Sequence, residues 1–231
     1  MDMDMENKIS VFGIGIDSRP AKESLKAAIE LMDGEGLSTI EILTMDMLLK
    51  ERDNEEIKEI LAKMDLVLPE SEAMLKMAEN PEVKHAAETA EKRGFLQMYL
   101  KYLQKYKKRV FLLAEDDRQC EQVSELLKKE YRGILLTGSG VLPEGGEEES
   151  VINEINGLEI DCILSVLSSP HQELFAENAR NMLSAKMWLG LSRMLRKKQE
   201  EGKKTYKAKN FFIRNLFRHS VGKENRQDQQ N

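Results

Sequence analysis

Three polar side chains that could catalyse a group transfer follow two short apolar runs. Thr44 and Asp46 lie at the end of the run 38–44, and Glu70 comes directly after the run 65–69. A carboxylate in such a place can act as a general base that removes the proton of a hydroxyl group. A glutamate at the start of a helix is also favourable simply because it complements the helix dipole. The residues therefore leave a catalytic and a structural interpretation of Glu70 open.

A second group of candidate residues follows the apolar run 160–167. Residues 168–170, Ser-Ser-Pro, are typical of a helix start, so His171, Gln172 and Glu173 fall in the first helical turn. In a parallel sheet, ligands bind at the carboxyl ends of the strands, and free backbone N–H groups at a helix start favour phosphate. The same residues would also suit an ordinary well-capped helix that binds nothing.

Two further connections differ in their suitability for phosphate. Residues 137–140, Thr-Gly-Ser-Gly, are predicted to form a turn after a short strand. Residues 115–117 are Glu-Asp-Asp, where a nucleotide-binding loop would usually be rich in glycine. Acidic side chains repel phosphate unless a divalent ion bridges them. The acidic loop therefore argues against simple P-loop-like binding.

Short apolar runs alternate with amphipathic segments along the chain and would position these residues. Strands are predicted at 9–16, 38–44, 65–69, 110–114, 134–137, 160–167 and 186–189. Helices are predicted at 21–32, 54–64, 71–78, 81–90, 95–106, 118–130, 147–155 and 170–183. Gly13 and Gly15 lie inside the first predicted strand, where close packing is the expected reason for them. Strands separated by helices of this length imply right-handed crossovers. We therefore expect an α/β fold with a Rossmann-like, mostly parallel sheet and helices on both faces.

The composition is that of a globular protein. Of 231 residues, 41% are hydrophobic, and there is neither an N-terminal apolar run nor a stretch of about 18 apolar residues. We therefore expect a cytoplasmic protein. Cys120 and Cys162 have no spacing typical of metal ligands and are expected to be reduced thiols. We expect no metal site and no cofactor.

Positive charge is concentrated near the C-terminus. The chain has a net charge of −6, yet residues 193–226 contain twelve Lys or Arg and only three Glu. We expect a domain of residues 1–190, a basic helical appendage at 191–223 and a disordered tail at 224–231. The appendage could lie on anionic lipid, dock on its own domain or, with less support, bind RNA; we favour lipid and expect no nucleic-acid partner. The residues expected at the membrane are Phe211, Phe212, Arg214, Leu216, Phe217 and Arg218.

Several short motifs occur in the order typical of one enzyme family. They are Gly15-Ile-Asp17, Thr44-Met-Asp46, Asp65-Leu-Val-Leu-Pro-Glu70, Arg93-Gly94, Val110-Phe-Leu-Leu113, Glu130-Tyr131 before residues 137–140, and Ser169-Pro-His-Gln-Glu173. In this order they resemble the WecG/TagA/CpsF glycosyltransferases, whose most specific motif is Gly-x-Pro-Lys-Gln-Glu. Gln172 and Glu173 match that motif outright. The resemblance covers residues 9–190.

The chain departs from the family pattern where a nucleotide would bind. In the motifs that follow the predicted strands 38–44 and 65–69, Asp46 stands where the family has an Asn, and Glu70 stands where it has the Asp that is thought to be the catalytic base. The other replacements are Ala114-Glu115 for a Gly-Gly pair, Ser168 or Ser169 for a glycine, His171 for a lysine, and residues 191–195 for Gly-Gly-x-Phe-Asp. Each lost glycine adds a Cβ where backbone would approach the nucleotide, and the lost lysine weakens diphosphate binding. The chain is therefore identified as a divergent member.

The resemblance implies an inverting enzyme that transfers a sugar, expected to be an N-acetylhexosamine, from a UDP-sugar to a lipid-linked acceptor. The setting would be cell-surface polysaccharide or teichoic-acid-type synthesis at the inner face of the cell membrane. Glu70 would be the base. Substrate would be bound by Thr44, Asp46, Arg93, Gln172 and Glu173, and nucleotide by Thr137, Gly138, Ser139, Gly140, Ser169 and His171.

A second interpretation follows from the same departures. The lost glycines and the acidic loop suit a catalytically degenerate member that serves as a membrane-associated binding or scaffolding protein. Family members can self-associate, so the resemblance also leaves a homo-oligomer open.

Overall fold

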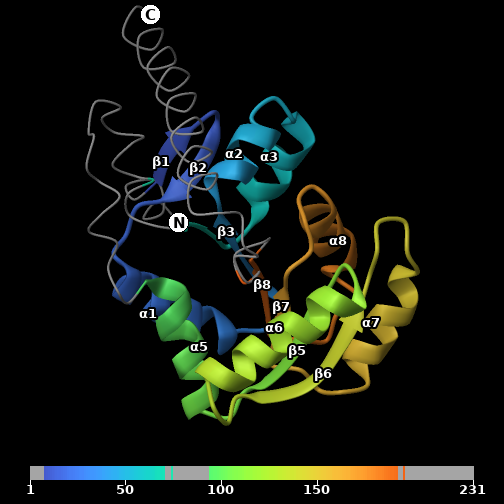
Figure 1. The fold of residues 1–231 in the computed structure, drawn as a ribbon. Coiled ribbons are helices and arrows are strands. Elements are labelled where there is room, and N and C mark those ends of the chain that lie inside the picture. The colour runs from blue at the N-terminus through green and yellow to red at the C-terminus, as the bar shows by residue number, and fades with distance from the viewer. Residues whose placement is uncertain (1–7, 71–73, 75–93, 192–194, 196–231) are drawn as a thin grey trace, which may run out of the picture.

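A computed structural model describes residues 8–70, 74, 94–191 and 195 of the chain. In this part, six strands form one sheet in the spatial order β4-β3-β8-β7-β5-β6 (Figure 1). They are β3 (Ser38–Leu43), β4 (Leu66–Pro69), β5 (Arg109–Ala114), β6 (Leu135–Val141), β7 (Cys162–Ser165) and β8 (Met187–Gly190). Every neighbouring pair is parallel. The expected α/β fold with a Rossmann-like parallel sheet is confirmed.

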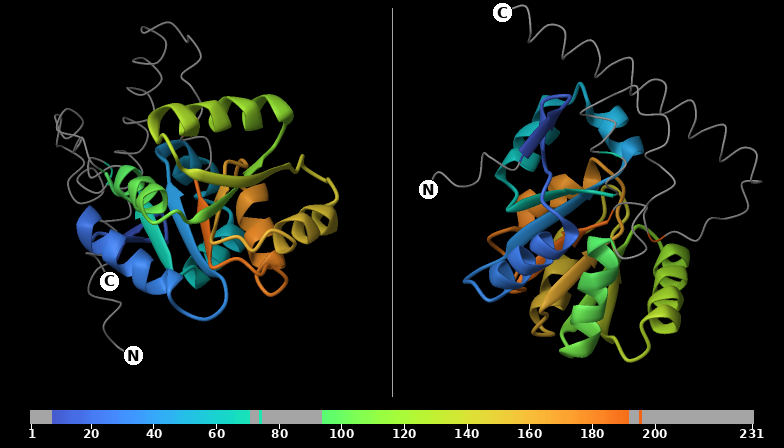
Figure 2. Two further views of the ribbon diagram at one scale, coloured as in Figure 1. Left: turned by 90° about the horizontal axis from the view of Figure 1, so that it is seen from below. Right: turned by 90° about the vertical axis from the view of Figure 1, so that its left-hand side faces the viewer.

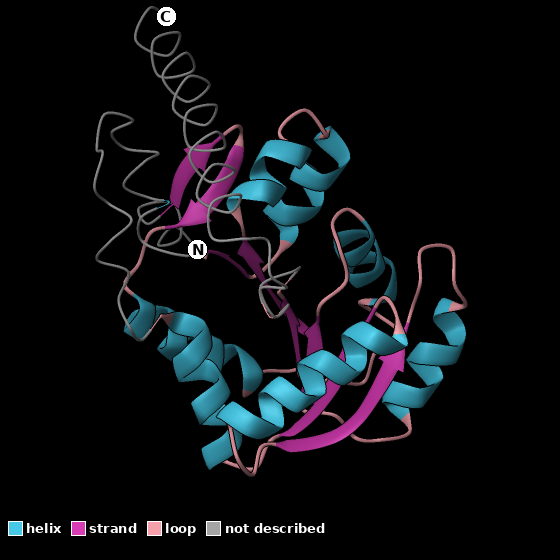
Figure 3. Cartoon of the chain, viewed as in Figure 1, coloured by secondary structure: helices cyan, strands magenta, loops and turns pink. Residues whose placement is uncertain are grey.

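Helices cover both faces of this sheet (Figure 3). One face packs against α2 (Met45–Glu51), α3 (Glu55–Lys63), α7 (Glu148–Asn156) and α8 (His171–Ala179). The other packs against α1 (Ala21–Met32), α5 (Phe95–Lys105) and α6 (Asp117–Glu130). In β5, Phe111 enters the first core and Val110 and Leu112 the second, as the two-residue period of a strand requires. Because both faces are covered, the strands are nearly continuous apolar runs in the sequence.

The first predicted strand is wrong: residues 9–16 form part of a hairpin outside the main sheet. Its strands, β1 (Lys8–Val11) and β2 (Ile14–Asp17), are antiparallel. Phe12 and Gly13 form the turn, with φ of 54° and 77°. A two-residue turn with both φ values positive suits the twist of a hairpin, and glycine adopts such a φ without strain. Gly13 therefore serves a turn, and not the close packing that the sequence suggested.

The hairpin lies against β4 and α3, at the end of the molecule away from β6 (Figure 2). One carboxylate oxygen of Asp17 accepts a hydrogen bond from the N–H of Val67 in β4 at 3.1 Å. Its other oxygen pairs with Arg19 at 2.9 Å. Asp17 is fully buried, so these two bonds satisfy a charge that water cannot reach.

The predicted turn at residues 137–140 is also wrong, because β6 continues through it to Val141. The pairing register between β5 and β6 shifts between Val110 and Phe111. The glycines make room for neighbouring side chains: a Cβ on Gly138 would lie 2.6 Å from Cδ1 of Leu158 and 2.9 Å from Cδ2 of Phe111, and one on Gly140 would lie 3.0 Å from Cζ of Phe111. Packing on an edge strand accounts for these glycines without a nucleotide.

Among the described residues, no helix is long and apolar enough to cross a membrane. The appendage and tail expected at 191–231 lie outside the described residues, apart from Leu191 and Leu195. The proposed domain boundaries therefore stay a prediction.

Candidate active site

The carboxyl ends of β3 and β4 bring together three of the residues expected to do chemistry. These strands are parallel neighbours, and the N–H of Glu70 donates to the carbonyl of Leu43 at 2.9 Å. Thr44 caps α2, because its hydroxyl oxygen accepts a bond from the N–H of Met47 at 3.2 Å. Asp46 lies in the first turn of α2, a short helix that the sequence did not predict. Two strand ends thus gather one hydroxyl and two carboxylates.

The carboxylate of Glu70 is the group best suited to accept a proton. Glu70 has an exposed surface, yet the protein around its carboxylate withdraws it enough from water to raise its pKa. A hydrogen bond from the backbone of Met45 opposes this rise, and the negative charge of Asp46 adds to it. A carboxylate with a raised pKa is a stronger base than an ordinary glutamate.

Gln172 and Glu173, expected to bind substrate, lie in the first turn of α8 and are fully buried. The side-chain nitrogen of Gln172 donates to Oε1 of Glu41 in β3 at 2.7 Å and lies 3.4 Å from Oε1 of Glu173. Gly190 in β8 leaves the space for this contact. A Cβ there would lie 2.8 Å from the same nitrogen and closer still to the Glu41 carboxylate. The hydrogen bond between Gln172 and Glu41 thus links α8 to β3. Contact of Gln172 and Glu173 with substrate stays a prediction.

The two buried carboxyl groups share a strong preference for the protonated form. Burial raises the pKa of Glu41 well above its ordinary value, and the nearby Glu173 adds to the rise. Burial likewise raises the pKa of Glu173 to about 7; Ser169 and Gln172 oppose the rise, and Glu51 adds to it. Two adjacent buried carboxylates cannot both ionise without a large electrostatic penalty. The pair therefore retains a proton near neutral pH.

Sequence reasoning missed Glu41 altogether. The available signal was an acidic residue between Ile40 and Ile42, inside a strand that is buried along its whole length. Such a residue is rare unless it has a partner in the interior.

A hydrogen-bonded bridge joins the segments that follow β5 and β7. These strands are neighbours, but α6 follows β5 onto one face and α8 follows β7 onto the other. Open α/β sheets bind ligands at such a switch point. Here Glu115, after β5, accepts bonds from the N–H of Ser168, at 2.7 Å, and from its hydroxyl. Beside it, Gln119 accepts from the N–H of Glu115 at 2.7 Å and donates to the carbonyl of Val166 at 2.8 Å.

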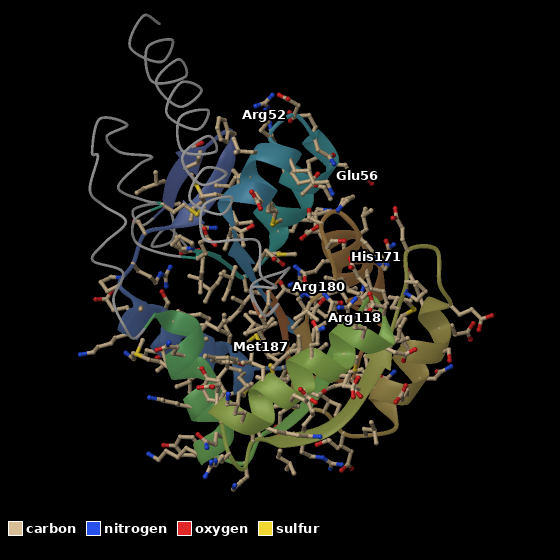
Figure 4. All side chains as sticks on the ribbon, in the orientation of Figure 1. Arg52, Glu56, Arg118, His171, Arg180 and Met187 are labelled. Atoms are coloured by element: carbon tan, nitrogen blue, oxygen red, sulfur yellow. The ribbon has the colours of Figure 1, made fainter. Side chains whose placement is uncertain are left out.

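The acidic loop thus has structural partners that the sequence did not reveal. Glu115 holds the connection between β7 and α8, and Asp116 caps α6 by accepting a bond from the N–H of Gln119 at 2.7 Å. Of the two predicted nucleotide-binding residues here, Ser169 is buried and its carbonyl accepts a bond from Lys50. His171 is half-buried in the first turn of α8 (Figure 4). Their contact with nucleotide stays a prediction.

The remaining predicted site residues do not join Glu70 in the described part of the molecule. Thr137, Gly138, Ser139 and Gly140 lie in β6, at the opposite edge of the sheet from β4. With strands about 4.8 Å apart, the two edges are separated by more than roughly 20 Å. Arg93 and the six residues expected at the membrane lie outside the described residues.

Within the described ranges, no cluster of three or more His, Cys, Asp or Glu side chains could hold a metal ion. Burial raises the pKa of the Cys162 thiol to about 12, which keeps it protonated and unreactive.

Comparison with known proteins places this geometry in a family. No curated protein matches the chain. The model of the family described as "Glycosyl transferase WecG/TagA/CpsF family" matches residues 9–196, which include all six strands of the sheet and the hairpin except Lys8. The match extends over most of the 231 residues. The chain therefore belongs to the WecG/TagA/CpsF family of glycosyltransferases.

Proposed function

We propose that the protein transfers an N-acetylhexosamine from a UDP-sugar to a hydroxyl group of a lipid-linked acceptor, with Glu70 as the general base. Membership of the family implies a sugar donor and an acceptor. The observation that carries the proposal is the position of Glu70 beside Asp46 at the carboxyl ends of two adjacent strands, with a pKa raised by its surroundings. Ligands of open parallel sheets bind at these carboxyl ends of the strands.

In the proposed reaction, the carboxylate of Glu70 takes the proton of the acceptor hydroxyl as its oxygen attacks the anomeric carbon of the sugar. The bond between that carbon and the UDP oxygen breaks, and UDP leaves with the bonding electrons. Attack from the side opposite to UDP inverts the anomeric configuration. The hydroxyl of Thr44 accepts a bond from the N–H of Met47 and retains its own hydrogen for donation to substrate. Asp46 is suited to accept a bond from a sugar hydroxyl.

The rest of the proposal is supported by the sequence. Arg93 would stabilise the departing diphosphate, and the aromatic and basic residues of the appendage would hold the enzyme at the anionic inner face of the membrane, where lipid-linked acceptors lie. Such a position would suit a role in cell-surface polysaccharide or teichoic-acid-type synthesis.

A transfer assay with UDP-N-acetylhexosamines and a short-chain lipid diphosphate acceptor tests the proposal. We expect Glu70→Gln to lower the rate about a thousandfold, because the amide cannot accept the proton. Glu56→Gln, on the exposed surface of α3, is the matched control and should leave the rate unchanged (Figure 4). Transfer by Glu70→Gln at the wild-type rate, or no transfer by the wild type from any UDP-sugar, would refute the proposal.

A degenerate member that serves as a membrane-associated binding or scaffolding protein is the second candidate. The bridge between Glu115 and Ser168 favours it, because this contact engages hydrogen-bond donors at the switch point where a nucleotide would be expected to bind. Binding to anionic vesicles without any UDP binding or transfer would select this candidate.

A further inference from the structure

The switch point between the ends of β5 and β7 is occupied by a carboxylate of the protein itself. Glu115 reaches across it from the end of β5 and takes both donors of Ser168, its backbone N–H and its hydroxyl. A phosphate at this switch point would need donors of the same kind. The carboxylate therefore competes with any phosphate for the same hydrogen atoms.

Some of the backbone positions at the start of α8 have no donor to offer in their place. Pro170 has no N–H, the N–H of Gln172 donates to the carbonyl of Ser168 at 3.0 Å, and that of Leu174 donates to the carbonyl of Pro170 at 3.1 Å. An arriving phosphate would also meet the negative charge of Glu115 itself. Both effects oppose an anion at this place in the resting protein.

Glu115 is not needed to join the two strands. β5 and β7 are paired through their backbones from Val110 to Leu113. The buried side chain of Gln119 also links the two strand ends through Glu115 N–H and the Val166 carbonyl. The carboxylate of Glu115 can thus be changed while these links remain.

We propose that Glu115 is a specificity-determining residue, whose carboxylate occupies the place of a donor phosphate at the switch point between the ends of β5 and β7. A diphosphate binds there only by displacing this carboxylate from Ser168. The native protein consequently binds diphosphates weakly at this site, and removal of the carboxylate increases their affinity. The choice of a diphosphate as the ligand rests on the function proposed above.

Calorimetric titration with inorganic pyrophosphate and with UDP, without acceptor, tests this inference. The proteins compared are the wild type, Glu115→Gln, Glu115→Ala and, as the matched control, Asp117→Asn. Asp117 is an exposed carboxylate in the first turn of α6, two residues from Glu115, and its replacement removes the same charge but leaves the bridge intact. The glutamine variant keeps the shape of the side chain, and the alanine variant removes most of the side chain together with the carboxylate.

We expect both Glu115 variants to bind pyrophosphate and UDP about tenfold more tightly than the wild type, the effect of removing one like charge beside the ligand. Asp117→Asn should change the affinity by less than about threefold. Unchanged or weaker binding by both Glu115 variants, an equal gain in Asp117→Asn, or no binding to any variant would overturn the inference.

The inference and the proposed function can fail separately. Tighter pyrophosphate binding without sugar transfer by any variant would support the role of Glu115 and refute the transferase. Transfer that depends on Glu70, with a diphosphate affinity that the Glu115 variants leave unchanged, would support the transferase and refute the role of Glu115.

Discussion

Carboxyl groups gather in two regions of this sheet, and the regions differ in their access to substrate. Glu70 and Asp46 stand at the ends of β4 and β3, where both residues have exposed surface. Glu41 in β3 and Glu173 in the first turn of α8 are fully buried. Withdrawal from water raises the pKa of Glu70, Glu41 and Glu173 alike. The first region can exchange a proton with a bound hydroxyl, whereas the second keeps its proton to avoid two buried charges.

The comparison teaches that a raised pKa does not by itself identify a catalytic carboxylate. Structural networks perturb pKa values as active sites do. Access decides between the two roles, and here the residues that match the family motif most closely lie on the inaccessible side.

The largest effect is expected from adding a methyl group to the buried region. Gly190→Ala would place a Cβ against the Glu41 carboxylate and 2.8 Å from the Gln172 nitrogen, between strands that cannot move apart. We expect it to lower the free energy of unfolding in urea by about 3 kcal/mol. Gly15→Ala, whose Cβ would meet only Lys8 at 3.5 Å, should change it by less than about 0.5 kcal/mol. Similar losses in the two variants would show that the buried cluster is not tightly packed.

Glu173→Gln separates the buried region from the exposed one by its pH dependence. A carboxyl group whose pKa is raised by folding makes the protein lose stability as the pH rises from the unfolded-state value through the folded-state value, here from about 4.5 to about 7. Glu173 alone should account for a fall of about 2 kcal/mol over this interval, and Glu173→Gln should remove that share, whereas the share that is due to Glu41 should remain. Urea unfolding at several pH values measures both.

Glu177→Gln, on the same helix but at the surface pair with Lys63, is the control and should preserve the wild-type pH dependence. Glu41 and Glu51 also face Glu173, so a remaining slope in Glu173→Gln would be attributed to Glu41. A wild-type stability that rises with pH through neutrality would contradict a shared proton in the interior.

The smallest effect is expected at the exposed region. Asp46→Asn removes a charge that raises the pKa of Glu70, so the acid limb of the kcat/KM profile for transfer should move to lower pH. Asp53→Asn, just beyond the C-terminal end of α2, should not move it. A shift to higher pH, or none, would mean that Asp46 does not act on the base.

Much of the fold could be predicted from the sequence because a buried parallel strand has its own pattern. The continuous apolar runs before Thr44, Glu70 and Ser168 predicted the strands, and strand ends of a parallel sheet meet at one edge. This is why Thr44, Asp46 and Glu70 were expected together at the carboxyl ends of the strands. The hairpin was missed because Val11-Phe-Gly-Ile14 is as apolar as a strand, and only the backbone shows the positive φ at Phe12.

What could not be predicted depends on contacts between distant segments. Residues 137–140 resembled a turn because of two glycines, which make room for Phe111 on the neighbouring strand and for Leu158. The partners of Glu41 and Glu115 lie 131 and 53 positions further along the chain, at Gln172 and Ser168. The sequence patterns therefore identified where the site is, but not which of its polar groups already bind one another.

The bond between Asp17 and Val67 has a consequence for solubility. β4 is an edge strand, and an exposed row of N–H groups on such a strand can pair with a strand of another molecule. The Asp17 carboxylate accepts the N–H of Val67 in the way that the carbonyl of an added strand would. A single side chain of the hairpin thus blocks intermolecular strand pairing at the midpoint of this edge, and the hairpin thereby opposes aggregation.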